Sequence, residues 1–249
     1  MKINFMAGHS HWAKIKYKKA ASDAKKGQIF SKIAREITIA VREKGSNPEF
    51  NPRLRLALDR AKEVNMPSDN VERAIKRGTG EISGEKLEEV MFEIFGPGGT
   101  KILVAGITDN KNRSFAQLRQ VLNKHNAKLG SEGSVRWFFK KLASVGLKIS
   151  EQPLAYQNKE KIELVAIEAG AQDFYWQDNE FYIYFLPEEG EKGKNFLTEQ
   201  GVKIDSFSLE WVPQENIKLD EKGIETNKKF LEELDELDFV QEIYINLDL

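Results

Sequence analysis

The 249-residue chain contains no cysteine, which excludes disulfides, thiolate metal sites and cysteine nucleophiles together. Histidine is nearly as scarce: His9 and His11 form an H-x-H pair, but no carboxylate stands near them before Asp23. Two ligands are too few for a stable tetrahedral metal site. No run of about 18 apolar residues is present, which excludes a membrane-spanning helix, and the front end lacks the apolar stretch of an export signal. We expect a cytoplasmic protein with no metal, no cofactor and no membrane partner.

Catalytic signatures are absent as well. The chain has no H-E-x-x-H or G-x-S-x-G element, and the third histidine, His125, lies on an expected helix with no nucleophile motif beside it. "GPGGTK", which begins at Gly96, lacks the spacing of a phosphate-binding loop and joins two apolar runs, so it predicts a hairpin turn. Glu188, Glu189 and Glu191 stand among glycines in what we expect to be a solvated turn. These features predict a protein that is not an enzyme.

Acidic residues are few at the front of the chain. Residues 1–80 hold 18 Lys and Arg against 8 Asp and Glu, whereas residues 81–249 hold 20 against 31. So concentrated a positive charge indicates a polyanionic partner, of which nucleic acid is the commonest. Two alternatives stay open: a solvated, charge-rich surface, and a basic domain that docks on the acidic remainder of its own chain. Neither explains the aromatic residues interleaved among the first cations, so nucleic acid is favoured.

Three amphipathic segments predict helices between residues 28 and 78. The first has apolar residues at three- and four-residue spacing and ends at Gly45. The second opens with Asn51 as a candidate N-cap and Pro52 at the first helical position, where a missing N–H costs nothing. The third follows Pro67 and ends near Gly78. Short connections make such helices antiparallel neighbours, which predicts a three-helix bundle.

Strand-like segments dominate the remainder, and the fold class we expect is α+β and multidomain. A basic arm and three-helix bundle (1–80) precede two α/β sandwich-like modules with a ferredoxin-like element order. Neither flank of the central stretch buries both faces of its own sheet, so we expect a discontinuous domain (81–130 plus 207–249) with a second domain (131–206) inserted in it. The strand near 207–213 could belong to either module, and we assign it to the discontinuous one.

Motifs in the first 135 residues carry a family resemblance. In one order stand "MAGHSHWAKIK", "KAASDAKKGQIFSKIAREI", "NPRLRLALDRAK", "MPSDNVERAIKRGTG", "GPGG", "TDNKNRS" and "LGSEGSV". The chain closely resembles the YebC/PmpR family of bacterial proteins, catalogued as probable DNA-binding transcriptional regulators, which also includes the mitochondrial translational activator of cytochrome c oxidase. The resemblance implies a helical bundle and two α/β modules around a cleft, with no known catalytic activity. It also implies two competing functions, control of transcription on DNA and ribosome binding that assists translation through stretches such as consecutive prolines.

Cations and aromatic residues of the arm and bundle are the candidate nucleic-acid contacts, because Lys and Arg neutralise phosphates while imidazole and indole stack on unpaired bases. The candidates are His9, His11, Trp12, Lys14, Lys16, Lys18, Lys19, Lys25, Lys26, Lys32, Arg35, Arg53, Arg55, Arg73, Lys76 and Arg77. The competing interpretations are a Trp12 that docks the arm on the bundle, and cations that form a solvated face.

A loop between an expected strand and helix supplies a second candidate contact. "TDNKNRS" spans Thr108 to Ser114, and ligand-binding residues are common in such loops. We expect Asn112 to cap the helix while Asp109 and Arg113 face outward, and with Asn110 these residues form a candidate RNA or protein contact.

These features predict a non-enzymatic, nucleic-acid-binding regulator of gene expression, a DNA-binding transcriptional regulator by its family resemblance. The alternative is a translation factor that binds the ribosome and its RNA. The acidic modules are expected to contact protein, either the ribosome or the transcription machinery. The third hypothesis is a protein–protein adaptor.

Overall fold

The computed structural model describes residues 23–84 and 86–247, which fold into two compact units. Residues 136–218, together with 246 and 247, form one unit. The described chain up to Val135 and residues 219–245 form the other. The chain therefore leaves one unit at residue 136, builds the second, and returns to complete the first.

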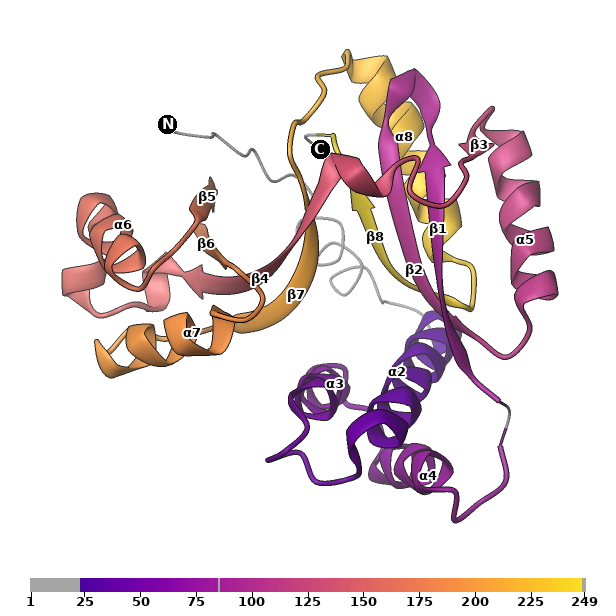
Figure 1. The fold of residues 1–249 in the computed structure, drawn as a ribbon, viewed down its shortest axis with the longest axis horizontal. Helices are drawn as coiled ribbons and strands as arrows, with labels where there is room; N and C mark the ends of the chain where they lie inside the picture. The colour runs from indigo at the N-terminus through magenta and orange to yellow at the C-terminus, as the bar shows by residue number, and fades with distance from the viewer. Residues whose placement is uncertain (1–22, 85, 248–249) are drawn as a thin grey trace. The chain divides into compact units, whose positions relative to one another are not determined.

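Three helices open the described chain: α2 (Asp23–Lys44), α3 (Pro52–Glu63) and α4 (Ser68–Thr79) (Figure 1). Their core is aliphatic and includes the fully buried Ile37 and Leu54. The side chain of Asn51 accepts a hydrogen bond from the Leu54 amide at 3.0 Å, so the predicted cap is confirmed.

The third helix, α4, does not end at Gly78 as predicted. The left-handed Gly80 (φ 81°) follows the helix instead, and Gly78 allows α4 to approach α2, because a Cβ there would lie 2.6 Å from the Val41 Cβ.

The first sheet has the strand order β3-β1-β2-β8 with antiparallel neighbours. Its strands are β1 (Glu88–Phe95), β2 (Lys101–Thr108), β3 (Lys128–Leu129) and β8 (Val240–Ile245). The predicted turn between β1 and β2 is confirmed: Pro97–Gly99 form one 3₁₀ turn, closed by a 2.9 Å hydrogen bond from the Gly96 amide to the Thr100 carbonyl. Helices α5 (Lys111–Lys124) and α8 (Glu221–Asp235) lie side by side, with the His125 and Phe230 rings 5.0 Å apart (Figure 1).

The second sheet belongs to residues 136–218 and has the order β5-β6-β4-β7, again antiparallel. Its elements, in chain order, are β4 (Phe139–Lys148), α6 (Lys159–Glu168), β5 (Asp173–Gln177), β6 (Glu180–Phe185), α7 (Gly190–Glu199) and β7 (Ser206–Pro213). This βαββαβ succession with the first strand between the third and fourth is a ferredoxin-like arrangement. Short 3₁₀ turns at Arg136–Phe138, Ile149–Glu151 and Leu154–Tyr156 complete the unit. We call residues 136–218 the inserted domain.

One prediction about the inserted domain is wrong. Strand β7 pairs with β4 from Phe139↔Pro213 to Gly146↔Ser206, so it lies in the inserted sheet and not in the discontinuous domain. The reason is that β4 is a long strand of ten residues, whose second edge needs a partner as long as β7.

The expected solvated turn at Glu188–Glu191 is confirmed in part: Glu188 and Glu189 are exposed in a turn, whereas the exposed Glu191 lies in α7, which begins at Gly190. A Cβ at Gly190 would lie 2.3 Å from the Cβ of Ala143, and one at Gly193 would lie 2.3 Å from the Phe185 ring. The two glycines therefore let the first turns of α7 pack directly on the sheet.

Candidate nucleic-acid interface

The arm candidates His9, His11, Trp12, Lys14, Lys16, Lys18 and Lys19 lie outside the described residues, so their role stays a prediction. Lys25 and Lys26 fall in the first turns of α2. The side chain of Lys25 also lies outside the description, whereas Lys26 is exposed.

Lys32 is not on the surface of the bundle, so the prediction that it contacts a ligand is wrong. Its side chain is 6% exposed, and its Nζ lies 3.3 Å from a carboxylate oxygen of Asp235. The same Nζ donates to the Asp235 carbonyl. Because α2 packs against the end of α8 at this point, the ammonium is enclosed and neutralised inside the protein.

Arg53 is also held by carboxylates. Its guanidinium lies 2.9 Å from Glu43 and 2.5 Å from Glu89. Burial by itself would lower the pKa of Arg53, but the hydrogen bonds and charges of Glu89 and Glu43 outweigh it and raise that pKa. Arg60 is held in the same manner, 3.1 Å from both Glu36 and Glu242. These arginines attach the bundle to itself and to the first sheet, and little of their charge is left for a ligand.

Four predicted cations are not paired with a carboxylate of the described chain. Arg55 on α3 and Arg73, Lys76 and Arg77 on α4 are exposed and form no ion pair with any described residue. Spacings of three and four residues place the α4 cations on one face of that helix. We call Arg73, Lys76 and Arg77 the α4 cations.

Arg77 also lines a groove of about 310 Å³ with Arg35 and Arg42 of α2. Arg35 donates from Nη1 to the Asp238 carbonyl, and Arg42 donates from Nη1 to the Leu87 carbonyl at 2.9 Å. A carbonyl orients a guanidinium without cancelling its charge, and no Asp or Glu is among the described residues that line this space. We call Arg35, Arg42 and Arg77 the arginine groove. It is the place in the described bundle where cations are both oriented and left unneutralised.

The structure brings Arg35 and Arg77 together although 42 positions separate them in sequence, and it adds Arg42 to them. Arg42 follows Arg35 by seven residues, two helical turns, and that spacing is the signal that identifies it. No pattern within either helix places α4 beside this face of α2.

The loop before α5 differs from its prediction. Asn110, and not Asn112, is the N-cap: its side chain accepts a hydrogen bond from the Arg113 amide at 3.0 Å. Arg113 forms an ion pair with Asp109, and Lys111 forms one with Glu88 at 3.0 Å. Asn112 is exposed. The described contacts of Asp109, Asn110 and Arg113 thus explain this loop as a helix start, with its cations paired inside the protein.

No group of three or more His, Asp or Glu side chains among the described residues is placed to hold a metal ion. Within residues 23–84 and 86–247, no helix combines the length and apolar character that crossing a bilayer requires.

Comparison with known proteins gives concordant matches along nearly the whole chain. The family model described as the TACO1/YebC protein N-terminal domain matches residues 10–81, and that of the TACO1/YebC second and third domain matches residues 87–247. A probable transcriptional regulatory protein of Halothermothrix orenii is 45% identical over 98% of this chain and 96% of its own length. One from Caldanaerobacter subterraneus subsp. tengcongensis is 44% identical over 98% of this chain and 99% of its own. The crystal structure of a conserved hypothetical protein from Aquifex aeolicus superposes with a TM-score of 0.81, at 42% identity over 95% of this chain and 96% of that one.

Proposed function

The chain belongs to the TACO1/YebC family, and on this premise we propose that it is a nucleic-acid-binding regulator of gene expression whose helical bundle grips the phosphate backbone. The observation that carries the proposal is the arginine groove with the adjoining α4 cations. Five cations in all are oriented by carbonyls or face solvent, without a carboxylate among the described residues to neutralise them. A surface of this kind favours binding of phosphates.

Transcriptional control on DNA is the form of regulation that the names of the relatives support. Translation on ribosomal RNA is the alternative. It is equally compatible with the exposed bundle side chains, because Lys and Arg contacts to phosphate position a protein without reading a base sequence. Such contacts serve a folded RNA as well as a duplex. The acidic remainder of the chain would then restrict where the basic face settles, or would contact protein.

The test is charge reversal in matched sets of three residues. The triple variant R73E/K76E/R77E reverses the α4 cations, and K161E/K192E/K203E reverses three exposed lysines of the inserted domain that also have no ion pair among the described residues. Both variants change the net charge equally. We expect the first to weaken binding to a duplex DNA and to a ribosomal RNA fragment at least hundredfold, and the second to change it less than threefold.

Equal losses in both variants would mean that binding follows net charge alone, and the proposed interface would be wrong. Circular dichroism of both variants guards against a folding defect. Crosslinking in living cells, followed by sequencing of the attached nucleic acid, then separates the two forms of regulation. Reads at promoters support transcription, reads at a few ribosomal RNA positions support translation, and a protein that crosslinks to neither but keeps its protein partners is an adaptor.

A further inference from the structure

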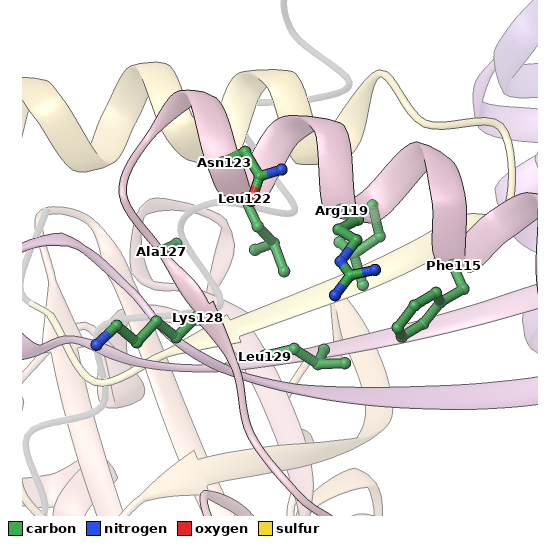
Figure 2. Close-up of a pocket in the computed structure, with 8 residues that line it drawn as sticks. Phe115, Arg119, Leu122, Asn123, Ala127, Lys128 and Leu129 are labelled. Atoms are coloured by element: carbon green, nitrogen blue, oxygen red, sulfur yellow. The ribbon is translucent and has the colours of Figure 1, made fainter.

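A second groove lies outside the bundle, between α5 and the short edge strand β3. It has a volume of about 460 Å³ and is lined by Phe115, Leu118, Arg119, Leu122, Asn123 and residues 127–129 (Figure 2). The lining side chains of α5 recur at positions 115, 119, 122 and 123, which is one flank of the helix. Figure 2 shows Phe115, Arg119 and Leu122 pointing from that flank toward β3. We call this space the α5–β3 groove.

The floor and rim of the α5–β3 groove differ in character. Leu118 and Leu122 are buried and form an apolar floor, whereas Phe115 at 39% and Leu129 at 38% exposure stand open at the rim. The Arg119 guanidinium lies 5.8 Å from the centroid of the Phe115 ring. An exposed aromatic ring with a guanidinium beside it offers planar surfaces on which a flat ligand can stack.

The charge of the groove is positive and unneutralised. Arg119 and Lys128 are exposed and have no ion pair with a described residue, and no Asp or Glu lines the groove in the described chain. Lys124, on another flank of α5, is by contrast held by Glu233 at 2.7 Å. The lining also carries the exposed amide of Asn123, which can donate and accept hydrogen bonds.

We propose that the α5–β3 groove binds one unpaired nucleotide of a nucleic-acid strand, with the base stacked at Phe115 and the phosphate held by Arg119 and Lys128. The amide of Asn123 is within the same lining and contacts the base edge. This inference rests on the proposed function and adds to it a second, single-strand site in the same compact unit as the bundle. A bound peptide is disfavoured because β3 has two residues, which present too few backbone groups for an added strand.

The experiment compares a single-stranded U12 RNA with a blunt-ended 12-base-pair RNA duplex by fluorescence anisotropy at constant salt. The substitution Phe115→Ala is expected to weaken U12 binding about tenfold and to change duplex binding less than twofold, since a duplex does not offer an unstacked base. Phe115→Tyr, which keeps the ring, should restore the wild-type affinity. Trp137→Ala is the control, because Trp137 is a 64% exposed aromatic residue of the inserted domain, and it should leave U12 binding unchanged.

Two further outcomes separate this inference from the function on which it rests. If the wild-type protein binds both RNAs and Phe115→Ala binds U12 equally well, the nucleotide site is overturned while the bundle interface stands. If Phe115→Ala and Trp137→Ala weaken U12 binding equally, stacking is not specific to the groove, and the site is overturned as well. Because Phe115 is at the rim and not in the core, its replacement leaves the fold intact, and Lys128→Glu offers a second variant that should weaken U12 binding in the same direction.

Discussion

The bundle and the inserted domain use their cations in opposite ways. Residues 23–80 hold 13 Lys and Arg against 8 Asp and Glu, and residues 136–218 hold 10 against 14. In the inserted domain, Lys148 lies 2.6 Å from Asp205, Lys159 lies 5.0 Å from the Trp176 ring, and Lys194 lies 4.8 Å from the Phe207 ring. These cations stabilise their own domain. In the arginine groove, Arg35 and Arg42 donate to carbonyls instead, and no carboxylate of the described residues that line the groove neutralises them.

A count of basic residues therefore overstates the charge available to a ligand. Lys32 and Arg53 contribute to the positive count of the bundle, yet both are neutralised by carboxylates. What distinguishes the candidate interface is the class of acceptor that holds each cation.

Salt dependence should give the largest effect. If the bundle engages about six phosphates, the affinity for nucleic acid falls roughly a thousandfold between 50 and 200 mM salt. The double variant R35Q/R42Q removes two charges and keeps a polar side chain at each position. We expect it to reduce the slope of log affinity against log salt by about 1.5. In the inserted domain, K159Q/K194Q should leave the slope unchanged, and an equal change in both variants would remove the distinction between the domains.

Lys32 tests the opposite role within the bundle itself. Lys32→Ala leaves Asp235 without its buried partner and should lower the free energy of unfolding by about 2–4 kcal/mol, measured by denaturant titration with circular dichroism. The control is Lys62→Ala, because Lys62 and Asp59 form an exposed pair worth less than about 1 kcal/mol. Neither variant should change nucleic-acid affinity while the protein is folded. A loss of affinity without a loss of stability would return Lys32 to the interface.

Lys32 also shows where prediction from sequence stops. The helices of the bundle, the Asn51 cap and the turn at Gly96 follow from signals within a few residues, and they were predictable. The burial of Lys32 depends on Asp235, more than 200 positions away, and no local pattern contains that contact. The same holds for β7, whose partner is decided by the length of β4. Asn110 and not the predicted Asn112 caps α5, and because both side chains are the same amide, residue type alone does not decide between them.

The substitution Gly193→Ala tests whether the inserted domain unfolds independently of the bundle. A Cβ at this position would lie 2.3 Å from the Phe185 ring, so Gly193→Ala should destabilise the inserted domain by about 1–3 kcal/mol. Tryptophan fluorescence in a Trp12→Phe background reports this domain alone, because the three other tryptophans are at positions 137, 176 and 211. Nucleic-acid affinity should not change.

The matched glycine in the bundle is Gly27, which lies within α2 and whose Cβ would meet nothing within 4 Å. Gly27→Ala should stabilise the helix by about 0.5–1 kcal/mol and leave the tryptophan transition unmoved. If Gly193→Ala shifts the unfolding of the bundle as much as that of the inserted domain, the two parts unfold as one cooperative unit and cannot be compared separately.

Tyr184 gives a small effect near pH 7 and a larger one at alkaline pH. It is fully buried on β6, its hydroxyl has no hydrogen-bond partner among the described residues, and burial, followed by the charge of Glu210, raises its pKa well above the usual value. An unfolded tyrosine ionises near pH 10, so above that pH the unfolded chain loses a proton that the folded domain retains, and stability falls as pH rises.

The substitution Tyr184→Phe removes this contribution to the pH dependence of stability. Near pH 7 it should change the free energy of unfolding by less than about 1 kcal/mol, since no hydrogen bond is lost. At pH 11, one unit above the ordinary pKa of tyrosine, the free energy of unfolding of the variant relative to wild type should be about 1.4 kcal/mol higher than it is near pH 7.

The tryptophan transition of the inserted domain is the measurement, and residues 23–80 contain no tyrosine that could produce the same response. Parallel curves for the two proteins from pH 8 to pH 11 would mean that water reaches the hydroxyl, and that this face of the inserted sheet is open to solvent.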